Sequence, residues 1–123
     1  MIIGLSTIQD EGAGFRTRVF MPRWNWLKNE LLQINFPQFE ELRIRLVIGD
    51  VESGCAVQGF EDEMTFVVES RIPIEHFKQF SIREKNDLVL DTIFESIKAA
   101  YTHFSEPPPP AIDQIWQEVR ALP

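Results

Sequence analysis

The sequence has very few of the residue types that build disulfides, metal sites and nucleophilic sites. Its 123 residues include one cysteine, Cys55, and two histidines, His76 and His103. A single cysteine excludes an internal disulfide, and the opening residues show no signal-peptide pattern, so we expect the reducing cytoplasm. No apolar run approaches the roughly 20 residues that a membrane-spanning helix needs. We therefore expect a cytoplasmic protein without a membrane segment.

Recognisable catalytic motifs are also lacking. The sequence contains no phosphate-binding GxxxxGK[ST], no dinucleotide-binding GxGxxG and no GxSxG nucleophile pattern. The two histidines lie far apart, with no second His or Cys at metal-ligand spacing. Acids rather than bases surround Cys55, which favours a small buried residue over a reactive thiol. The sequence therefore indicates no catalytic residue, no cofactor and no metal, and we predict that the protein is not an enzyme.

Basic residues are missing from a long central segment. Between Arg45 and Arg71 there is no Lys or Arg, and residues 46–123 hold six basic and fourteen acidic side chains, a net charge of −8. The total of −7 disfavours nucleic acid, which is bound mainly through Lys and Arg. The acids could steer a basic protein partner or could form a solvated rim that aids solubility. They are Asp50, Glu52, Glu61, Asp62, Glu63 and Glu69.

A basic cluster and one tryptophan stand out near the N-terminus. The cluster consists of Arg16, Arg18, Arg23 and Lys28, with no acid between Glu11 and Glu30. It could protect an edge strand through charge, or it could complement the acidic segment within the chain or in a homodimer. Trp26 falls on the polar side of the helix predicted from Pro22 to Ile34. It is therefore a candidate partner-binding residue, unless a loop or strand covers it.

The apolar pattern predicts a single α+β domain spanning residues 1–123. We expect an antiparallel sheet of four or five strands, with a long helix and a C-terminal helix packed on one face. Four prolines, Pro107 to Pro110, predict a stiff elbow between those two helices. The predicted strands are residues 2–8, 15–20, 42–48, 54–60 and 64–72, and the predicted helices are residues 22–34, 81–104 and 111–122.

The long helix from Ser81 to Phe104 is the strongest local signal. Ser81 and Glu84 have the spacing of a capping box at its start. Apolar side chains recur every three or four residues and predict one buried stripe, opposite a solvated polar face that includes Asp91, Glu95, Lys98 and Thr102. The stripe residues are Leu90, Ile93, Phe94, Ile97, Tyr101 and Phe104.

The C-terminal part of the chain resembles the small immunity-type proteins of bacterial toxin systems. In that pattern a strand leads through a short Phe-containing turn, here Ile74 to Phe80, into a helix such as Lys85 to Ile97. A second, Trp-bearing helix follows, as in Ile112 to Trp116, although the four prolines depart from the pattern. The resemblance implies a protein that binds a cognate toxin domain and blocks it without catalysis.

We therefore predict a non-catalytic binding protein that presents Asp50, Glu52, Glu61, Asp62, Glu63, Glu69 and Trp26 to a basic partner. Two other hypotheses remain open. One is a small-ligand-binding protein or enzyme with a pocket between sheet and helices, lined by residues such as His76, Glu75 or Arg45. The other is a structural homo-oligomer, such as a homodimer, joined through the basic and acidic patches.

Overall fold

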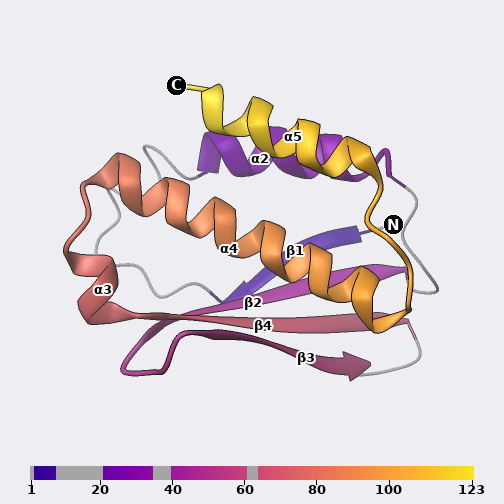
Figure 1. Cartoon of the computed structure of the whole chain (residues 1–123), viewed down its shortest axis with the longest axis horizontal. Helices are drawn as coiled ribbons and strands as arrows, with labels where there is room; N and C mark the ends of the chain where they lie inside the picture. The colour runs from indigo at the N-terminus through magenta and orange to yellow at the C-terminus, as the bar shows by residue number, and fades with distance from the viewer. Residues whose placement is uncertain (1, 8–20, 35–39, 61–63) are drawn as a thin grey trace.

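One sheet and three principal helices organise the chain. The computed structural model describes residues 2–7, 21–34, 40–60 and 64–123. Figure 1 shows the long helix α4 lying across the sheet, with α2 and α5 side by side beyond it. The described elements are β1 (Ile2–Thr7), α2 (Met21–Leu31), β2 (Glu41–Gly49), β3 (Gly54–Phe60), β4 (Thr65–Pro73), α3 (Ile74–Lys78), α4 (Ile82–His103) and α5 (Pro110–Ala121).

The sheet has the strand order β1-β2-β4-β3 and is mixed. β1 pairs with β2 in parallel, and β2 pairs with β4 in parallel. Only β3 and β4 are antiparallel. The predicted antiparallel sheet is therefore wrong. The chain leaves β2, passes the end of β4 to form the outer strand β3, and returns as β4 into the gap, which makes β4 run in the same direction as β2.

The loop at residues 50–53 makes this topology possible. It joins the end of β2, where Gly49 is opposite Pro73, to the start of β3, where Gly54 is opposite Arg71. It therefore crosses about two strand spacings, roughly 10 Å, which four residues can span. Alternating hydrophobicity defines the buried face of a strand but not the direction of its neighbours, so the sequence pattern could not reveal this crossing.

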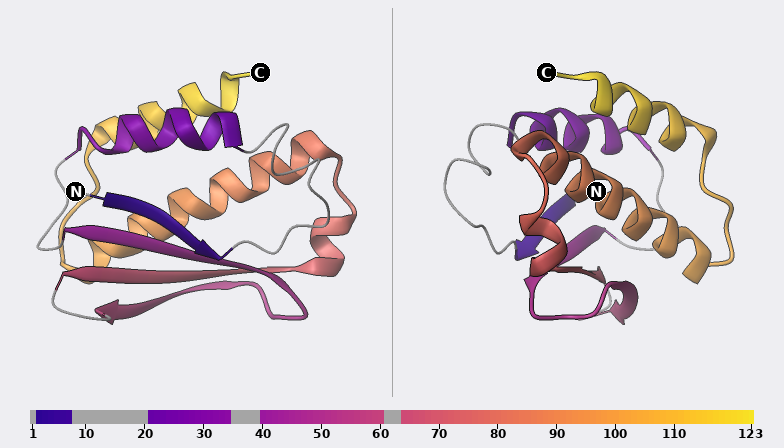
Figure 2. Two further views of the ribbon diagram at one scale, coloured as in Figure 1. Left: turned by 180° about the vertical axis from the view of Figure 1, so that it is seen from behind. Right: turned by 60° about the vertical axis from the view of Figure 1, so that its left-hand side comes forward.

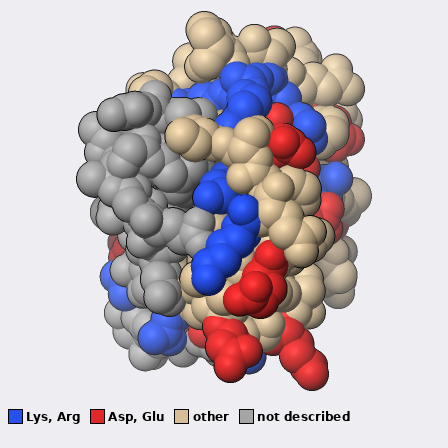
Figure 3. Space-filling model, turned by 90° about the vertical axis from the view of Figure 1, so that its left-hand side faces the viewer, with Lys and Arg blue, Asp and Glu red and all other residues tan. Residues whose placement is uncertain are grey.

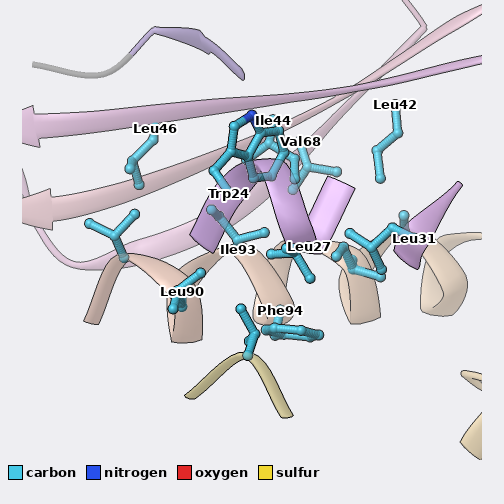
Figure 4. Packing of buried hydrophobic residues seen from close by; sticks show 14 of the residues in the cluster. Trp24, Leu27, Leu31, Leu42, Ile44, Leu46, Val68, Leu90, Ile93 and Phe94 are labelled. Atoms are coloured by element: carbon cyan, nitrogen blue, oxygen red, sulfur yellow. The ribbon is translucent and has the colours of Figure 1, made fainter. Parts of the chain in front are cut away.

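A single apolar core joins the sheet to the helices. Side chains of β2 alternate as predicted, with Leu42, Ile44, Leu46 and Ile48 buried toward the helices. Trp24 of α2 belongs to the same buried cluster as Ile44 and Val68. Phe94 of α4 points away from the sheet (Figure 4), and its ring lies 6.5 Å from that of Trp116 in α5. Thus α4 is apolar on two sides, one facing the sheet and the other facing the outer helices.

The predicted capping box at the start of α4 is confirmed. The Ser81 hydroxyl accepts the Glu84 N–H at 3.3 Å, and the Glu84 side chain accepts the Ser81 N–H at 3.3 Å. The polar positions of α4 are less uniformly solvated than predicted. Ser96 and Asn86 are fully buried, and Asp91 is half-buried at the contact with α5.

The C-terminal helix does not pack on the sheet as predicted. Instead α5 contacts α2 and α4, and Ile112, Ile115 and Val119 form its buried stripe. The proline elbow ends one residue earlier than predicted, because Pro110 is the first residue of α5, where a missing N–H costs nothing. Figure 2 shows this outer pair of helices from two further directions.

The prediction for the N-terminal third is only partly tested. The predicted helix spans residues 22–34, whereas α2 begins one residue earlier, at Met21, and ends three residues earlier, at Leu31. Trp24, Leu27 and Leu31 of the predicted stripe are buried, and Ile34 packs against the core from beyond the helix end. The predicted strand at residues 15–20 lies outside the described residues.

Candidate functional site

The acidic residues predicted to bind a partner are in very different environments. Asp50 and Glu52 are exposed in the loop between β2 and β3. Glu69, in contrast, is only 6% exposed in β4. Residues 61–63, which supply Glu61, Asp62 and Glu63, lie outside the described residues. The continuous acidic surface predicted from the sequence is therefore interrupted at Glu69.

Two arginines on neighbouring positions of the sheet neutralise Glu69. Arg71 Nε donates to Glu69 Oε1 at 2.7 Å, and Arg45 Nη1 lies 3.9 Å from Glu69 Oε2. Arg45 is directly opposite Glu69 in the parallel register of β2 and β4. Farther along the same face, Arg43 Nη2 donates to Glu41 Oε1 at 3.2 Å. This face of the sheet therefore carries paired charges, and Glu69 is less available to a partner than the sequence suggests.

Trp26 is not the exposed anchor that the helical wheel suggests. It is half-buried and packs against the apolar core. The alternative interpretation, that neighbouring parts of the chain cover it, agrees better with this placement. We therefore do not include Trp26 in the candidate surface.

The predicted basic cluster contains one residue with a clear structural role. Arg16 and Arg18 lie outside the described residues, and Lys28 is half-buried on α2. Arg23 is 1% exposed, although it was predicted to lie on a charged surface. A charged group can be buried only when its hydrogen bonds and its charge are satisfied, and Arg23 meets both conditions.

Arg23 clamps the C-terminal end of α5 onto α2 and α4. Its Nε and Nη2 donate to the Leu122 carbonyl at 3.2 and 2.6 Å, and Nη2 also donates to the Arg120 carbonyl at 3.1 Å. Its Nη1 donates to Asp87 Oδ1 at 2.7 Å. The last carbonyls of a helix lack partners within the helix and carry partial negative charge, so a guanidinium is well matched to them.

A second arginine joins the same cluster from α4. Arg83 donates to the carbonyls of Leu122 and Arg120 at 2.8 and 2.6 Å, and its Nε lies 3.6 Å from Asp87 Oδ1. Figure 3 shows this end of the molecule, where Lys and Arg side chains form a band beside Asp and Glu side chains. Because the two signs adjoin there, this end does not present a surface of one charge.

Two hollows lie between α4 and the sheet edge formed by β3. The first, of about 280 Å³, is lined by residues that include Ser53, Gly54, His76 and Glu95. The second, of about 410 Å³, lies farther along α4 and includes Lys98 and His103 in its lining. Cys55 and Glu95 line both, so the two hollows adjoin along the strand.

A third hollow lies on the other side of α4, against α5. It has a volume of about 330 Å³, and Glu95 also belongs to its lining. Its polar groups are mostly paired: Asp91 accepts from Trp116 Nε1 at 2.9 Å and from Arg120 Nη1 at 2.8 Å. Lys98 Nζ lies 3.6 Å from Asp113 Oδ1. Of the four charged residues that line this hollow, only Glu95 has no ion-pair partner within the described part of the chain.

Cys55 is exposed, which corrects the prediction of a small buried residue. Its strand lies at the edge of the sheet, so the side chain borders the hollows rather than the core. Its Sγ lies 3.6 Å from the Ser70 hydroxyl. The Ser70 and Ser96 hydroxyls are hydrogen-bonded to each other, and Ser96 donates to the Thr92 carbonyl at 3.0 Å. These contacts satisfy the buried hydroxyls without pairing the thiol with a base.

The residues named for a ligand pocket do not converge. His76 lines the smaller hollow beside β3. Glu75 is exposed on α3 with Lys78 Nζ at 3.8 Å, while Arg45 is on the outer sheet face beside Glu69. In the described part of the chain, no group of three or more His, Cys, Asp or Glu side chains is placed to hold a metal ion. The three residues predicted to line one pocket therefore lie in different parts of the molecule.

One interior residue has a strongly shifted proton affinity. Burial, together with a smaller effect of the nearby Glu106 carboxylate, raises the pKa of Tyr101 from 10.0 to about 12. Tyr101 is in the core stripe of α4, so a charged phenolate would be unfavourable there. This shift reflects packing rather than chemistry at the groove.

Comparisons with known proteins return no counterpart, since no family model, curated protein or solved structure matches the chain. The resemblance to immunity-type proteins therefore remains a prediction. Among the described residues, no helix is both long enough and apolar enough to span a membrane.

Proposed function

We propose that the chain is a non-catalytic binding protein that engages a basic surface of a protein partner. The observation that carries this proposal is the place of three exposed carboxylates that have no ion-pair partner among the described residues. Glu95 lines the hollows beside the start of β3, and Asp50 and Glu52 lie in the loop that leads into this strand. The other predicted acid that can be assessed, Glu69, is neutralised by arginines. The acidic surface is thus smaller than predicted and lies beside β3 and α4.

Two of the three carboxylates line depressions beside the start of β3. Glu95 lines both hollows between α4 and β3, and Glu52 lines a shallow depression that shares Cys55 with them. Asp50 belongs to the same loop as Glu52. Unpaired charges of one sign around a depression raise the rate at which an oppositely charged partner arrives more than they raise the final affinity.

The specific form of this proposal is an immunity-type inhibitor of a toxin domain. It rests on the resemblance carried by the segments that form α3, the start of α4 and α5. Growth of bacteria that express a captured partner domain, with and without this chain, tests that form. Growth inhibition that the chain does not relieve would contradict the inhibitor assignment and leave the binding function standing.

The binding function is tested by replacing Asp50, Glu52 and Glu95 with amides. A partner is isolated by affinity capture on the unmodified chain, and association rates are measured by surface plasmon resonance from low to high salt. We expect the triple variant to associate about tenfold more slowly at low salt and to lose most of its salt dependence.

A matched control variant removes the same number of negative charges at positions away from the start of β3. Replacing Glu75, Glu106 and Glu118 with glutamine also removes three negative charges, and all three side chains are exposed. The control should retain most of the salt dependence. Equal rates for the unmodified chain and the first variant, or equal losses in both variants, would refute the assignment of the partner surface.

A further inference from the structure

β3 is an edge strand that lacks charged residues and proline, two of the usual protections against strand pairing. It pairs with β4 on one side, and no described element lies on its other side. Its sequence, Gly-Cys-Ala-Val-Gln-Gly-Phe, contains no charged residue and no proline. Alternate residues of an edge strand direct their N–H and C=O groups away from the sheet, where another chain can pair with them.

The first half of β3 is the part suited to pairing. The register between β3 and β4 is regular from Gly54 to Val57 and shifts between Val57 and Gly59. Such a bulge bends the strand and limits regular pairing beyond it. Gly54, Cys55 and Ala56 are all exposed. An incoming strand can therefore be extended along about four residues before the bulge interrupts the ladder.

The hollows beside this half of β3 provide room for side chains. They lie between the strand and α4, with volumes of about 280 and 410 Å³, and Cys55 lines both. In an added strand every second side chain faces the helix-covered side of the sheet. Those side chains would enter the hollows, where Glu95 is exposed and unpaired within the described residues.

Charge indicates what kind of strand fits. Of the charged residues that line the two hollows, Arg71 is bound to Glu69 and Lys98 to Asp113, which leaves Glu95. Glu52, two residues before the strand, is also exposed and has no ion-pair partner within the described ranges. A basic segment would complement these carboxylates. A second copy of this chain would bring another set of acids and a net charge of −7.

We infer that β3 captures an extended segment of the partner as an additional strand, with Lys or Arg side chains of that segment meeting Glu52 and Glu95. This inference rests on the proposed function and specifies its recognition mode. Backbone hydrogen bonds supply the pairing, and the two carboxylates select for basic side chains.

The test uses a defined peptide probe with the whole chain. The probe is a short peptide of alternating lysine and valine. The control peptide has the same sequence, but alternate backbone amide nitrogens are methylated. Methylation preserves the charge but removes the donors and blocks the close approach that strand pairing requires. Fluorescence anisotropy should show at least tenfold weaker binding for the methylated peptide.

Side-chain variants test the charge component separately. Glu52→Gln and Glu95→Gln should each weaken binding of the unmethylated peptide about two- to fivefold, as expected for exposed ion pairs. Glu118→Gln, on the exposed face of α5, is the matched control and should leave the affinity unchanged. Hydrogen exchange should show new protection of amides within residues 54–57.

The outcomes separate this inference from the proposed function. If both peptides bind equally well, or if protection appears on another element, strand addition is refuted while binding of a basic partner stands. If neither peptide binds but a captured basic protein partner still shows the predicted salt dependence, strand addition is again refuted. If neither the peptides nor a basic protein partner binds, both fail.

Discussion

The C-terminal end of α5 and the outer edge of β3 differ in whether their backbone groups have hydrogen-bond partners within the described chain. At the clamp, Arg23 and Arg83 donate to the carbonyls of Arg120 and Leu122, so the last helix carbonyls are satisfied within the chain. At β3 the outer strand edge faces no described element, and two carboxylates nearby have no described partner.

This difference separates groups that stabilise the fold from groups available for recognition. A buried guanidinium whose donors are satisfied fixes three helices relative to one another, but it has nothing left to offer a partner. An unpaired edge contributes less to the fold and keeps its hydrogen-bonding groups available. The proposed binding surface therefore follows from the location of unused polar groups and not from the density of acids along the sequence.

The largest expected effect comes from breaking the clamp with Arg23→Met. The variant keeps an apolar stem but removes the buried donor, so that Asp87 and the α5 carbonyls keep only the more exposed Arg83. We expect a loss of about 3–5 kcal/mol in the free energy of unfolding, the usual result of removing one partner of a buried charge pair. Urea denaturation monitored by tryptophan fluorescence measures it.

An exposed ion pair provides the control for that experiment. Lys78 and Glu75 are 54% and 84% exposed, and the distance between Lys78 Nζ and Glu75 Oε1 is 3.8 Å. Lys78→Met should change the free energy of unfolding by less than about 1 kcal/mol. If Arg23→Met also lost less than about 1 kcal/mol in the free energy of unfolding, the contribution that we assign to Arg23 would be contradicted.

The buried Tyr101 predicts a loss of folding stability at high pH. Its pKa is raised to about 12 in the folded protein, from 10.0, so folding favours the neutral phenol. The associated stabilisation is complete below pH 10 and is lost as pH rises toward 12, because the unfolded chain releases its proton first. The loss should be on the order of 2 kcal/mol.

Because the chain has one tyrosine, its ultraviolet absorbance titrates Tyr101 directly. The absorbance midpoint should lie near pH 12 if the protein remains folded. Tyr101→Phe should remove the corresponding part of the stability loss, while titration of lysines and the thiol affects both proteins. A midpoint near pH 10 in folded protein would contradict the burial of this phenol.

The smallest predicted effect is a gain in stability, and it concerns a buried polar residue in the core. Asn86 is fully buried in α4, and neither its Nδ2 nor its Oδ1 has a hydrogen-bond partner in the described part of the chain. Unpaired buried polar groups are destabilising. Replacing Asn86 with leucine, which is similar in size, should raise the free energy of unfolding by about 1 kcal/mol.

The same urea titrations measure this change. Ser96→Ala is a useful comparison, because the Ser96 hydroxyl is buried but satisfied by the Thr92 carbonyl at 3.0 Å. That substitution should not stabilise the protein. Destabilisation by Asn86→Leu would indicate that the amide has a packing or hydrogen-bonding role that the described contacts do not include.

Much of the secondary structure could be predicted because its signals are local. The capping box at Ser81, the alternation from Leu42 to Ile48 and the stripes of α4 and α5 depend on residues close in the sequence. The parallel pairing of β2 with β4 depends on where the loop at residues 50–53 takes the chain. Side-chain periodicity contains no information about that route.

The candidate site was harder to predict because charge pairing is a long-range property. Glu69 pairs with Arg71, two residues farther along the strand, but the parallel register also places the distant Arg45 opposite it. Arg23 looked like a surface charge because its acceptors, Leu122 and Asp87, are distant in the sequence. Conversely, the sequence does not indicate Glu95 as a binding residue, because it lies on a helix face that is expected to be solvated.

Amide hydrogen exchange of the free chain and of its complex with the lysine–valine peptide tests the central comparison most directly. In the free chain we predict slow exchange for the interior of α5 and rapid exchange for the outward-facing amides within residues 54–57. Peptide binding should slow exchange in that part of β3 and leave α5 unchanged. Slow exchange of all β3 amides in the free chain, or protection of α5 instead of β3 by the peptide, would contradict the account.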